Sequence, residues 1–242
     1  MIPVGIAAQV PWHAATRVND DGTSSPWIER RVVSYAPSAR SLAGDGSVVR
    51  PGRVLAIGAA AADLHWADAE ADFAAESEGS MRVADVNGTR EHVLATIADY
   101  STVHIACHGV LDLVDPLRSA LQLSAGQQIL VRDLLAVDSV QGKTFILSAC
   151  DSTFASVQAA TEGANFPAVL LAGGARGAIG TLWPVSDYSS MLLMTDFHRR
   201  WRDDQTPAQA LRDAQLDMCR GRSGGRRAAH PYYWAGFVCY GT

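Results

Sequence analysis

Cysteine is scarce in this sequence, and positive charge is not in excess. The four cysteines among 242 residues are Cys107, Cys150, Cys219 and Cys239. Such sparse usage favours free thiols in a reducing cytoplasm over a disulfide framework, so we expect a cytoplasmic protein. The formal net charge is −5. Because phosphate groups are neutralised by a basic surface, we expect no nucleic-acid partner.

Long apolar runs are also missing. No run approaches the roughly 20 residues that a membrane-spanning helix needs, so we expect no membrane association. The first stretch, MIPVGIAAQVPWHAATRV, has no basic start and a proline within its apolar part, which disfavours a signal peptide. A polar loop, NDDGTSSP, follows at 19–26. We expect residues 1–29 to form an N-terminal extension and residues 30–242 to form one domain.

The rest of the chain alternates between strand-like and helix-like patterns. Strands are expected at 29–37, 52–58, 81–86, 102–109, 119–123, 143–150, 177–184 and 232–241. Helices are expected at 38–44, 65–78, 89–100, 163–175, 186–202 and from 206 onward, with a short hairpin and helix within 127–138. Continuous apolar strands such as VLAIG predict a mostly parallel central sheet sandwiched between helices.

Two of these strands stop on a reactive side chain. VHIACHGV, at 103–110, carries His108, and FILSACDS, at 145–152, carries Cys150. Ligands of parallel sheets bind beyond the carboxyl ends of the strands, so neighbouring strands would bring the two residues to one site. A nearby imidazole is what a nucleophilic thiol requires. The backbone amides of Gly109 and Cys150 are then candidates for an oxyanion hole.

Plainer interpretations exist for the same residues. A buried cysteine is commonly inert, and a histidine at a strand end commonly anchors a loop. A zinc site built from His104, Cys107 and His108 is opposed by strand alternation, which places His104 and His108 on one face and Cys107 on the other. GARGAIG, at 174–180, precedes a strand, whereas a dinucleotide loop follows one. We therefore expect neither a metal nor a cofactor.

Several ordered motifs resemble those of the CHAT family, caspase-like cysteine peptidases related to separase. They are VHIACHG, LSACDS, AGGARGAIGTLWPVSD and HPYYWAGFVCYG, with VVSYAPSARSL, GRVLAIG and DPLRSALQL beside them. The resemblance covers roughly residues 30–242 and implies a caspase-hemoglobinase-like fold. It also implies that His108 is the catalytic histidine and Cys150 the nucleophile, with oxyanion amides from Gly109 and Cys150.

The substrate pocket of this clan is formed after the cysteine strand and at the end of the next strand. Those places hold Asp151, Glu162, Trp183 and Asp187, whose acids predict a basic substrate residue. Asp187 could instead cap the following helix. The loop RGRSGGRR, at 220–227, would be an autocleavage site if the preference is basic, and otherwise a solvated loop.

The chain departs from many family members in two ways. Asp151 and Ser152 follow Cys150 where others carry Glu-Thr, and the helical repeats that select regulators are missing. The resemblance implies a cysteine endopeptidase acting on a protein or peptide substrate and switched on by a separate partner in a bacterial defence or cell-death pathway. The alternative is a catalytically silent interaction scaffold, against which the joint presence of His108, Gly109 and Cys150 argues. A small-molecule hydrolase would need a nucleophile elbow or a phosphate loop, and neither motif is found.

Overall fold

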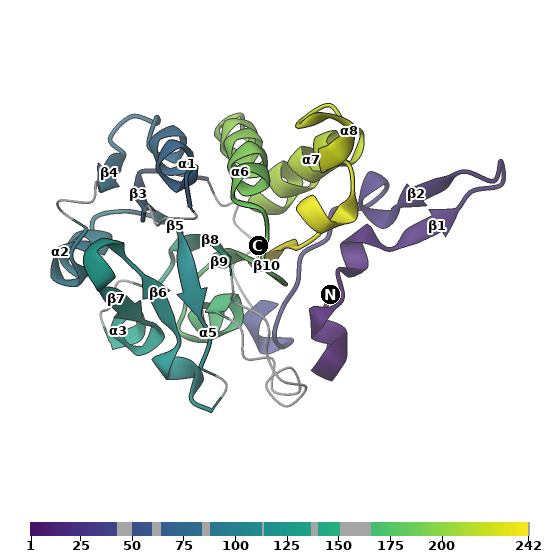
Figure 1. The fold of residues 1–242 in the computed structure, drawn as a ribbon. Coiled ribbons are helices and arrows are strands. Elements are labelled where there is room, and N and C mark those ends of the chain that lie inside the picture. Colours follow the sequence, from purple (N-terminus) through teal and green to yellow (C-terminus); the bar gives the residue numbers. More distant parts are fainter. Residues whose placement is uncertain are drawn as a thin grey trace.

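The computed structural model describes residues 1–42, 50–59, 64–83, 88–112, 114–136, 140–150 and 166–241, with Ala149 and Cys150 described by their backbone alone. Most of the described strands belong to a single mixed sheet of eight strands (Figure 1). Its strands are β3 (Val54–Gly58), β4 (Met81–Val83), β5 (Thr102–Val110), β6 (Ala120–Gln122), β7 (Gln128–Leu130), β8 (Thr144–Cys150), β9 (Gly177–Thr181) and β10 (Phe237–Gly241). A separate hairpin joins β1 (Thr16–Val18) to β2 (Ser24–Pro26).

The main path of the sheet has the order β10-β9-β8-β5-β3-β4. Neighbours from β9 to β4 run parallel, whereas β10 is antiparallel to β9. Strands β6 and β7 form an antiparallel extension that pairs with the end of β5. The expected mostly parallel sheet is therefore confirmed.

Helices cover both faces of this sheet, as Figure 1 shows. The first layer holds α1 (Ala67–Ala74), α6 (Asp187–Arg202) and α7 (Pro207–Cys219); the second holds α2 (Arg90–Ile97), α3 (Val131–Ala136) and α5 (Phe166–Ala172). Two helices start within a residue of the expected positions 89 and 206, and each has a side-chain cap. Thr89 Oγ1 accepts a hydrogen bond from the amide of His92 at 3.3 Å, and Thr206 forms a capping box with Gln209.

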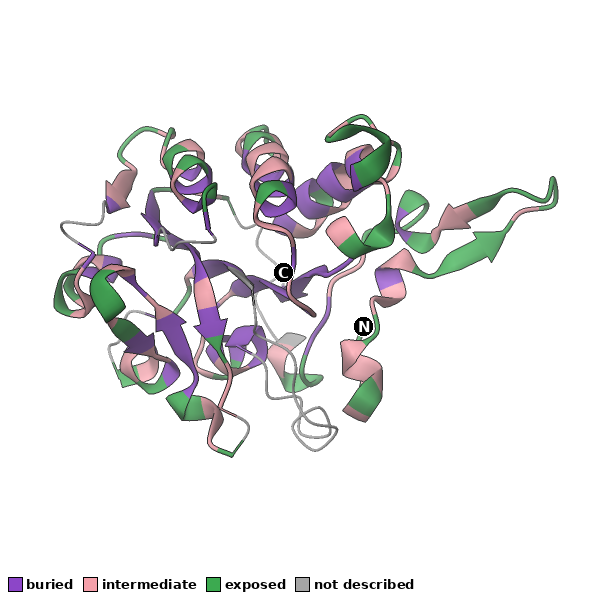
Figure 2. Ribbon diagram, in the orientation of Figure 1, coloured by how far each residue is buried: buried purple, intermediate pink, exposed green. Residues whose placement is uncertain are grey.

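Nearly all of β5, one of the two central strands of the path, is buried (Figure 2), and its successive residues pack on opposite faces of the sheet. Val103, Ile105 and Cys107 belong to the core cluster beneath α2, α3 and α5. Ala106 packs instead against Leu64 and Ala67 at the start of α1. Because successive residues of a strand face opposite sides, His104 and His108 share one face, as expected, and this is the face that α1 and α6 cover.

Strand β5 continues further than expected. Its parallel pairing with β3 ends where Gly58 meets Ala106, and β6 then takes the place of β3 with a pairing that runs from His108 to Val110. The expectation that His108 is the last residue of its strand is therefore wrong. The apolar run that ends at Gly109 gave no signal of this change of partner, since β6 lies more than ten residues downstream.

Residues 29–37 do not form the expected strand. Only Tyr35 pairs with the sheet, in an isolated bridge to Tyr240 of β10. Pro37 follows two residues later and has no amide hydrogen to continue a ladder. Shorter elements complete the description: η1 (Gly5–Gln9), η2 (Trp12–Ala14), η3 (Trp27–Glu29), η4 (Arg40–Leu42), η6 (Pro116–Arg118), η7 (Ser124–Gly126), η8 (Pro231–Tyr233) and α8 (Gly225–Ala228). The last of these lies in RGRSGGRR, so this segment is not all loop.

The first 29 residues pack on the rest of the chain. Ile28 belongs to the core cluster of α6, α7 and β10, and Trp12 packs against the cluster on the opposite face. His13 is buried, with Nδ1 2.8 Å from the Tyr35 hydroxyl and Nε2 3.3 Å from Gln215 Nε2. Gln215 also donates to the carbonyls of Trp234 and Phe237. This buried network joins the N-terminal segment to α7 and β10.

Candidate active site

His108 and Cys150 are register partners on neighbouring parallel strands. The ladder between β5 and β8 runs from Thr102 opposite Thr144 to His108 opposite Cys150, which is its last rung. Hydrogen-bonded strands lie about 4.8 Å apart, so the two backbones are within the reach of a side chain of each other. The sequence analysis made the shared site depend on these strands being neighbours, and the structure places them side by side.

The backbone around His108 is fixed on both sides. His108 is opposite Cys150 of β8 on one side and opposite Gln122 of β6 on the other, and it is only partly buried. Gly109 is buried and lies opposite Leu121 within the same antiparallel pairing. An exposed histidine at the free end of a strand would be held less firmly than one between two strands.

The start of α6 meets the start of α1 at this edge of the sheet. Asp187 Oδ2 accepts a hydrogen bond from the backbone amide of Trp66 at 2.9 Å, and the rings of Trp66 and Tyr188 are 5.1 Å apart. The N-cap of α6 is Ser186, and Asp187 is the first helical residue. Asp187 therefore lies in the first turn of α6 but is not its N-cap, and its Oδ2 accepts a hydrogen bond from the residue that precedes α1 rather than from an amide of α6.

Trp183 lies in the connection between β9 and α6. Its indole Nε1 donates to the carbonyl of Tyr232 at 3.0 Å, and a Cβ placed on Gly236 would come within 3.0 Å of the indole. Trp183 thus holds the segment that precedes β10 against the end of β9. The other two residues expected near a substrate, Asp151 and Glu162, lie outside the described residues.

A buried polar cluster lies behind the His108 position on the same face of β5. His104 Nε2 is 3.0 Å from Glu70 Oε1 of α1, and His104 Nδ1 is 3.1 Å from His198 Nε2 of α6. All three side chains are at most 2% exposed. Burial, then the charges of His104 and Arg202, holds the pKa of His198 well below its usual range, so this imidazole is neutral.

Sequence reasoning did not identify Glu70 or His198 as partners of His104. Each lies in a helical pattern where a polar residue would ordinarily face solvent, and His198 is 94 residues from His104. The sequence offered one indirect signal: alternation placed His104 within an apolar, buried strand, and a buried histidine needs hydrogen-bond partners.

The thiols with described side chains differ in access. Cys107 and Cys239 are buried, and Cys219 is partly buried. Burial raises the pKa of the Cys239 thiol to about 12, and it also raises the pKa of Cys219. Within the described ranges, no three His, Cys, Asp or Glu side chains are grouped so that they could hold a metal ion.

A mostly parallel sheet between two helical layers, with a histidine and a cysteine at the last rung of its central ladder, has the architecture of the caspase-like α/β proteins. A family model for the CHAT domain matches residues 1–242, and the chain belongs to this family of caspase-like cysteine peptidases. No curated protein matches the chain. The family match includes residues 1–29, and the domain boundary at residue 30 stays a prediction.

Hydropathy adds one further finding. Of the helices that the structure describes, none combines the length and the apolar character that crossing a membrane would require.

Proposed function

We propose that this chain is a cysteine endopeptidase that hydrolyses peptide bonds with His108 and Cys150. The observation that carries the proposal is the pairing of these two residues at the last rung between β5 and β8. The chain's membership of the CHAT family supports it, because family members resemble caspases in fold and in their peptidase motifs. Burial of Cys107 and Cys239 supports it further, since neither thiol is accessible to a substrate.

In the proposed mechanism, His108 accepts the proton of the Cys150 thiol, and the thiolate attacks the carbonyl carbon of the substrate. The backbone amides of Gly109 and Cys150 stabilise the oxyanion of the tetrahedral intermediate. His108 then protonates the departing amine, leaving a thioester on Cys150. Water, activated by His108, hydrolyses the thioester and restores the thiol.

The substrate in this proposal is a protein or peptide, bound near Trp183 and Asp187 together with Asp151 and Glu162. The acids among these residues favour a basic side chain next to the cleaved bond. We further propose that the enzyme is cytoplasmic, that a separate protein activates it, and that it serves a bacterial defence or cell-death pathway. The pathway and the activator rest on the family resemblance alone.

A thiol-directed peptide probe and a peptide library test the proposal together. Wild type should be labelled at Cys150 and should cleave the library. Cys150→Ala should lose both labelling and cleavage. In His108→Ala the cleavage rate should fall by at least ~10³-fold, the order seen when one member of a catalytic pair is removed. Cys219→Ala removes a partly buried thiol elsewhere and should behave as wild type.

The contrary outcome is equally clear. If wild type neither labels nor cleaves, alone or with a cell extract added as a source of activator, then the chain is the silent scaffold and the peptidase proposal is wrong. If cleavage persists in Cys150→Ala, the nucleophile has been misassigned.

A further inference from the structure

A cavity of about 310 Å³ lies beside the first turn of α6. Its lining residues come from the start of α6 and from the segment between α7 and β10: Ser186, Tyr188, Ser189, Gly224, Arg227, Ala228 and Tyr233. The start of α6 follows the carboxyl end of β9. Phe237, which opens β10, pairs with Thr181, which closes β9. Since β9 is parallel to β8, the cavity lies at the same edge of the sheet as Cys150.

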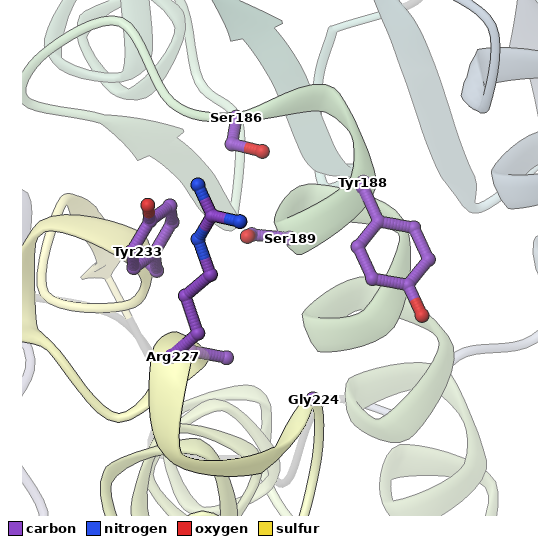
Figure 3. A pocket seen from close by; sticks show the side chains of 7 residues that line it. Ser186, Tyr188, Ser189, Gly224, Arg227 and Tyr233 are labelled. Carbon is purple, nitrogen blue, oxygen red and sulfur yellow. The ribbon is translucent and has the colours of Figure 1, made fainter.

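Among the lining residues that the structure describes, Arg227 supplies the only charge. Figure 3 shows its guanidinium group between Tyr233 and Ser189, extending toward Ser186. No residue in the described part of the chain forms an ion pair or hydrogen bond with Arg227. In contrast, Arg220 pairs with Glu29 and Arg222 pairs with Asp217. The guanidinium of Arg227 is thus available to a ligand.

Ser189 is a second, independent polar group in the cavity. It is only 5% exposed, and its hydroxyl has no hydrogen-bond partner among the residues that the structure describes. Figure 3 shows this hydroxyl directed toward Arg227. The hydroxyl belongs to the lining of the cavity, so a polar ligand atom there would hydrogen-bond to Ser189. Ser186 is the N-cap of α6, and its side chain makes no capping hydrogen bond.

The same position favours negative charge through the helix. α6 is 16 residues long, and its free amides and dipole at Ser186 attract an anion. An arginine fork matches the two oxygens of a carboxylate. The single guanidinium balances a single negative charge, which favours a carboxylate over a phosphate dianion. The rings of Tyr188 and Tyr233 provide apolar surface for the methylene groups of an acidic side chain.

We propose that this cavity binds the carboxylate of an aspartate or glutamate in the peptide substrate, at a subsite distinct from the acids around Asp187. The proposal rests on the proposed peptidase function for the identity of its ligand. It predicts a mixed specificity in which a basic residue lies at one position of the substrate and an acidic residue at another.

Cleavage of a position-randomised peptide library tests the role of the subsite. Wild type should favour Asp or Glu at one position, and Arg227→Ala should reduce that preference by ~10-fold or more, the expected effect of losing a charged hydrogen-bonding partner. Arg227→Lys should retain part of it, because lysine keeps the charge without the fork. Arg226→Ala, which removes the adjacent arginine outside the cavity lining, should match wild type.

Binding of capped amino acids tests the cavity without any cleavage. In saturation-transfer NMR with the full chain, N-acetyl-glutamate amide should bind at millimolar concentration, N-acetyl-glutamine amide should not, and Arg227→Ala should abolish the difference. A library profile unchanged by Arg227→Ala, or equal binding of the two capped residues, overturns the subsite. If nothing is cleaved but glutamate binding depends on Arg227, the peptidase proposal fails while the carboxylate site stands.

Discussion

His104 Nε2 lies 3.0 Å from Glu70 Oε1 in a region where neither side chain has meaningful contact with solvent. On the other side of the imidazole, Nδ1 is 3.1 Å from His198 Nε2. The cluster joins α1, β5 and α6 through polar atoms beneath an otherwise apolar face. Since β5 carries His108 four residues after His104, the position of the proposed dyad depends on a strand that this cluster anchors.

Removing the Glu70 carboxylate should destabilise the fold. Glu70→Ala removes the buried carboxylate that lies 3.0 Å from His104 Nε2, and we expect a loss of ~2–4 kcal/mol in the free energy of unfolding. Glu70→Gln keeps an oxygen acceptor and most of the volume, so its loss should be smaller. Urea denaturation followed by circular dichroism measures both. Glu76→Ala, at an exposed ion pair with Arg202, should change stability by less than ~1 kcal/mol.

If Glu70→Ala and Glu76→Ala cost the same, the buried cluster has no special structural role. The matched pair is informative because the two glutamates lie six residues apart in the chain, one against buried His104 of β5 and the other in an exposed ion pair with Arg202 of α6.

The helices and strands were predictable from the sequence wherever the local pattern of apolar and capping residues determines the element. The apolar run from Thr144 to Cys150 and the cap at Thr206 and Pro207 are such cases, and both elements begin or end where expected. The run from Arg31 to Tyr35 has a strand-like pattern too. It pairs with the sheet at one residue, where Tyr35 forms a bridge to Tyr240 at the β10 edge. The local sequence pattern does not indicate which edge of the sheet is open to a further strand.

The site was predictable in part for a related reason. Parallel topology makes the ends of β5 and β8 neighbours, so His108 and Cys150 follow from two strand patterns and one rule about sheet edges. The contacts of His104 with Glu70 and His198 depend on how two helices cross the sheet. No spacing in the sequence encodes that crossing, and the same is true of the cavity beside Arg227.

Protonation of His13 should destabilise the protein in mild acid. Burial lowers the pKa of His13 to about 4, whereas in the unfolded chain it is near the ordinary 6.5. The unfolded state therefore binds more protons than the folded state between these values, and stability falls as pH is lowered through that window. The full shift corresponds to ~3 kcal/mol. His198, whose pKa is also lowered, adds to the loss in the same direction.

His13→Gln should flatten this dependence, because glutamine does not titrate. The measurement is the unfolding free energy from urea denaturation between pH 7.5 and pH 4 in wild type and variant. His65→Gln, at an exposed histidine, should leave the slope as it is in wild type. An unchanged slope in His13→Gln would show that His13 is not responsible for the acid sensitivity.

Cys239 should resist alkylation as long as the protein is folded. Its thiol is 3% exposed, and burial raises its pKa to about 12, so thiolate is scarce at neutral pH. Iodoacetamide labelling mapped by mass spectrometry should find Cys219 modified before Cys107 and Cys239 in the native state. In 6 M guanidinium, a condition known to unfold most domains, all should react at similar rates. Rapid native labelling of Cys239 would contradict its burial.

Two substitutions at Asp187 should distinguish a structural role of this residue from a role in substrate binding. Its Oδ2 accepts the Trp66 amide, while no hydrogen bond or ion pair from the described residues reaches Oδ1. Asp187→Ala removes the acceptor and should cost ~1 kcal/mol of stability. Asp187→Asn keeps an oxygen for the Trp66 amide but removes the charge, so it should nearly preserve stability. If the carboxylate also attracts a basic substrate residue, Asp187→Asn should lower the library's preference for Arg or Lys by ~10-fold. A preference that survives in Asp187→Asn would leave Asp187 with the structural role alone.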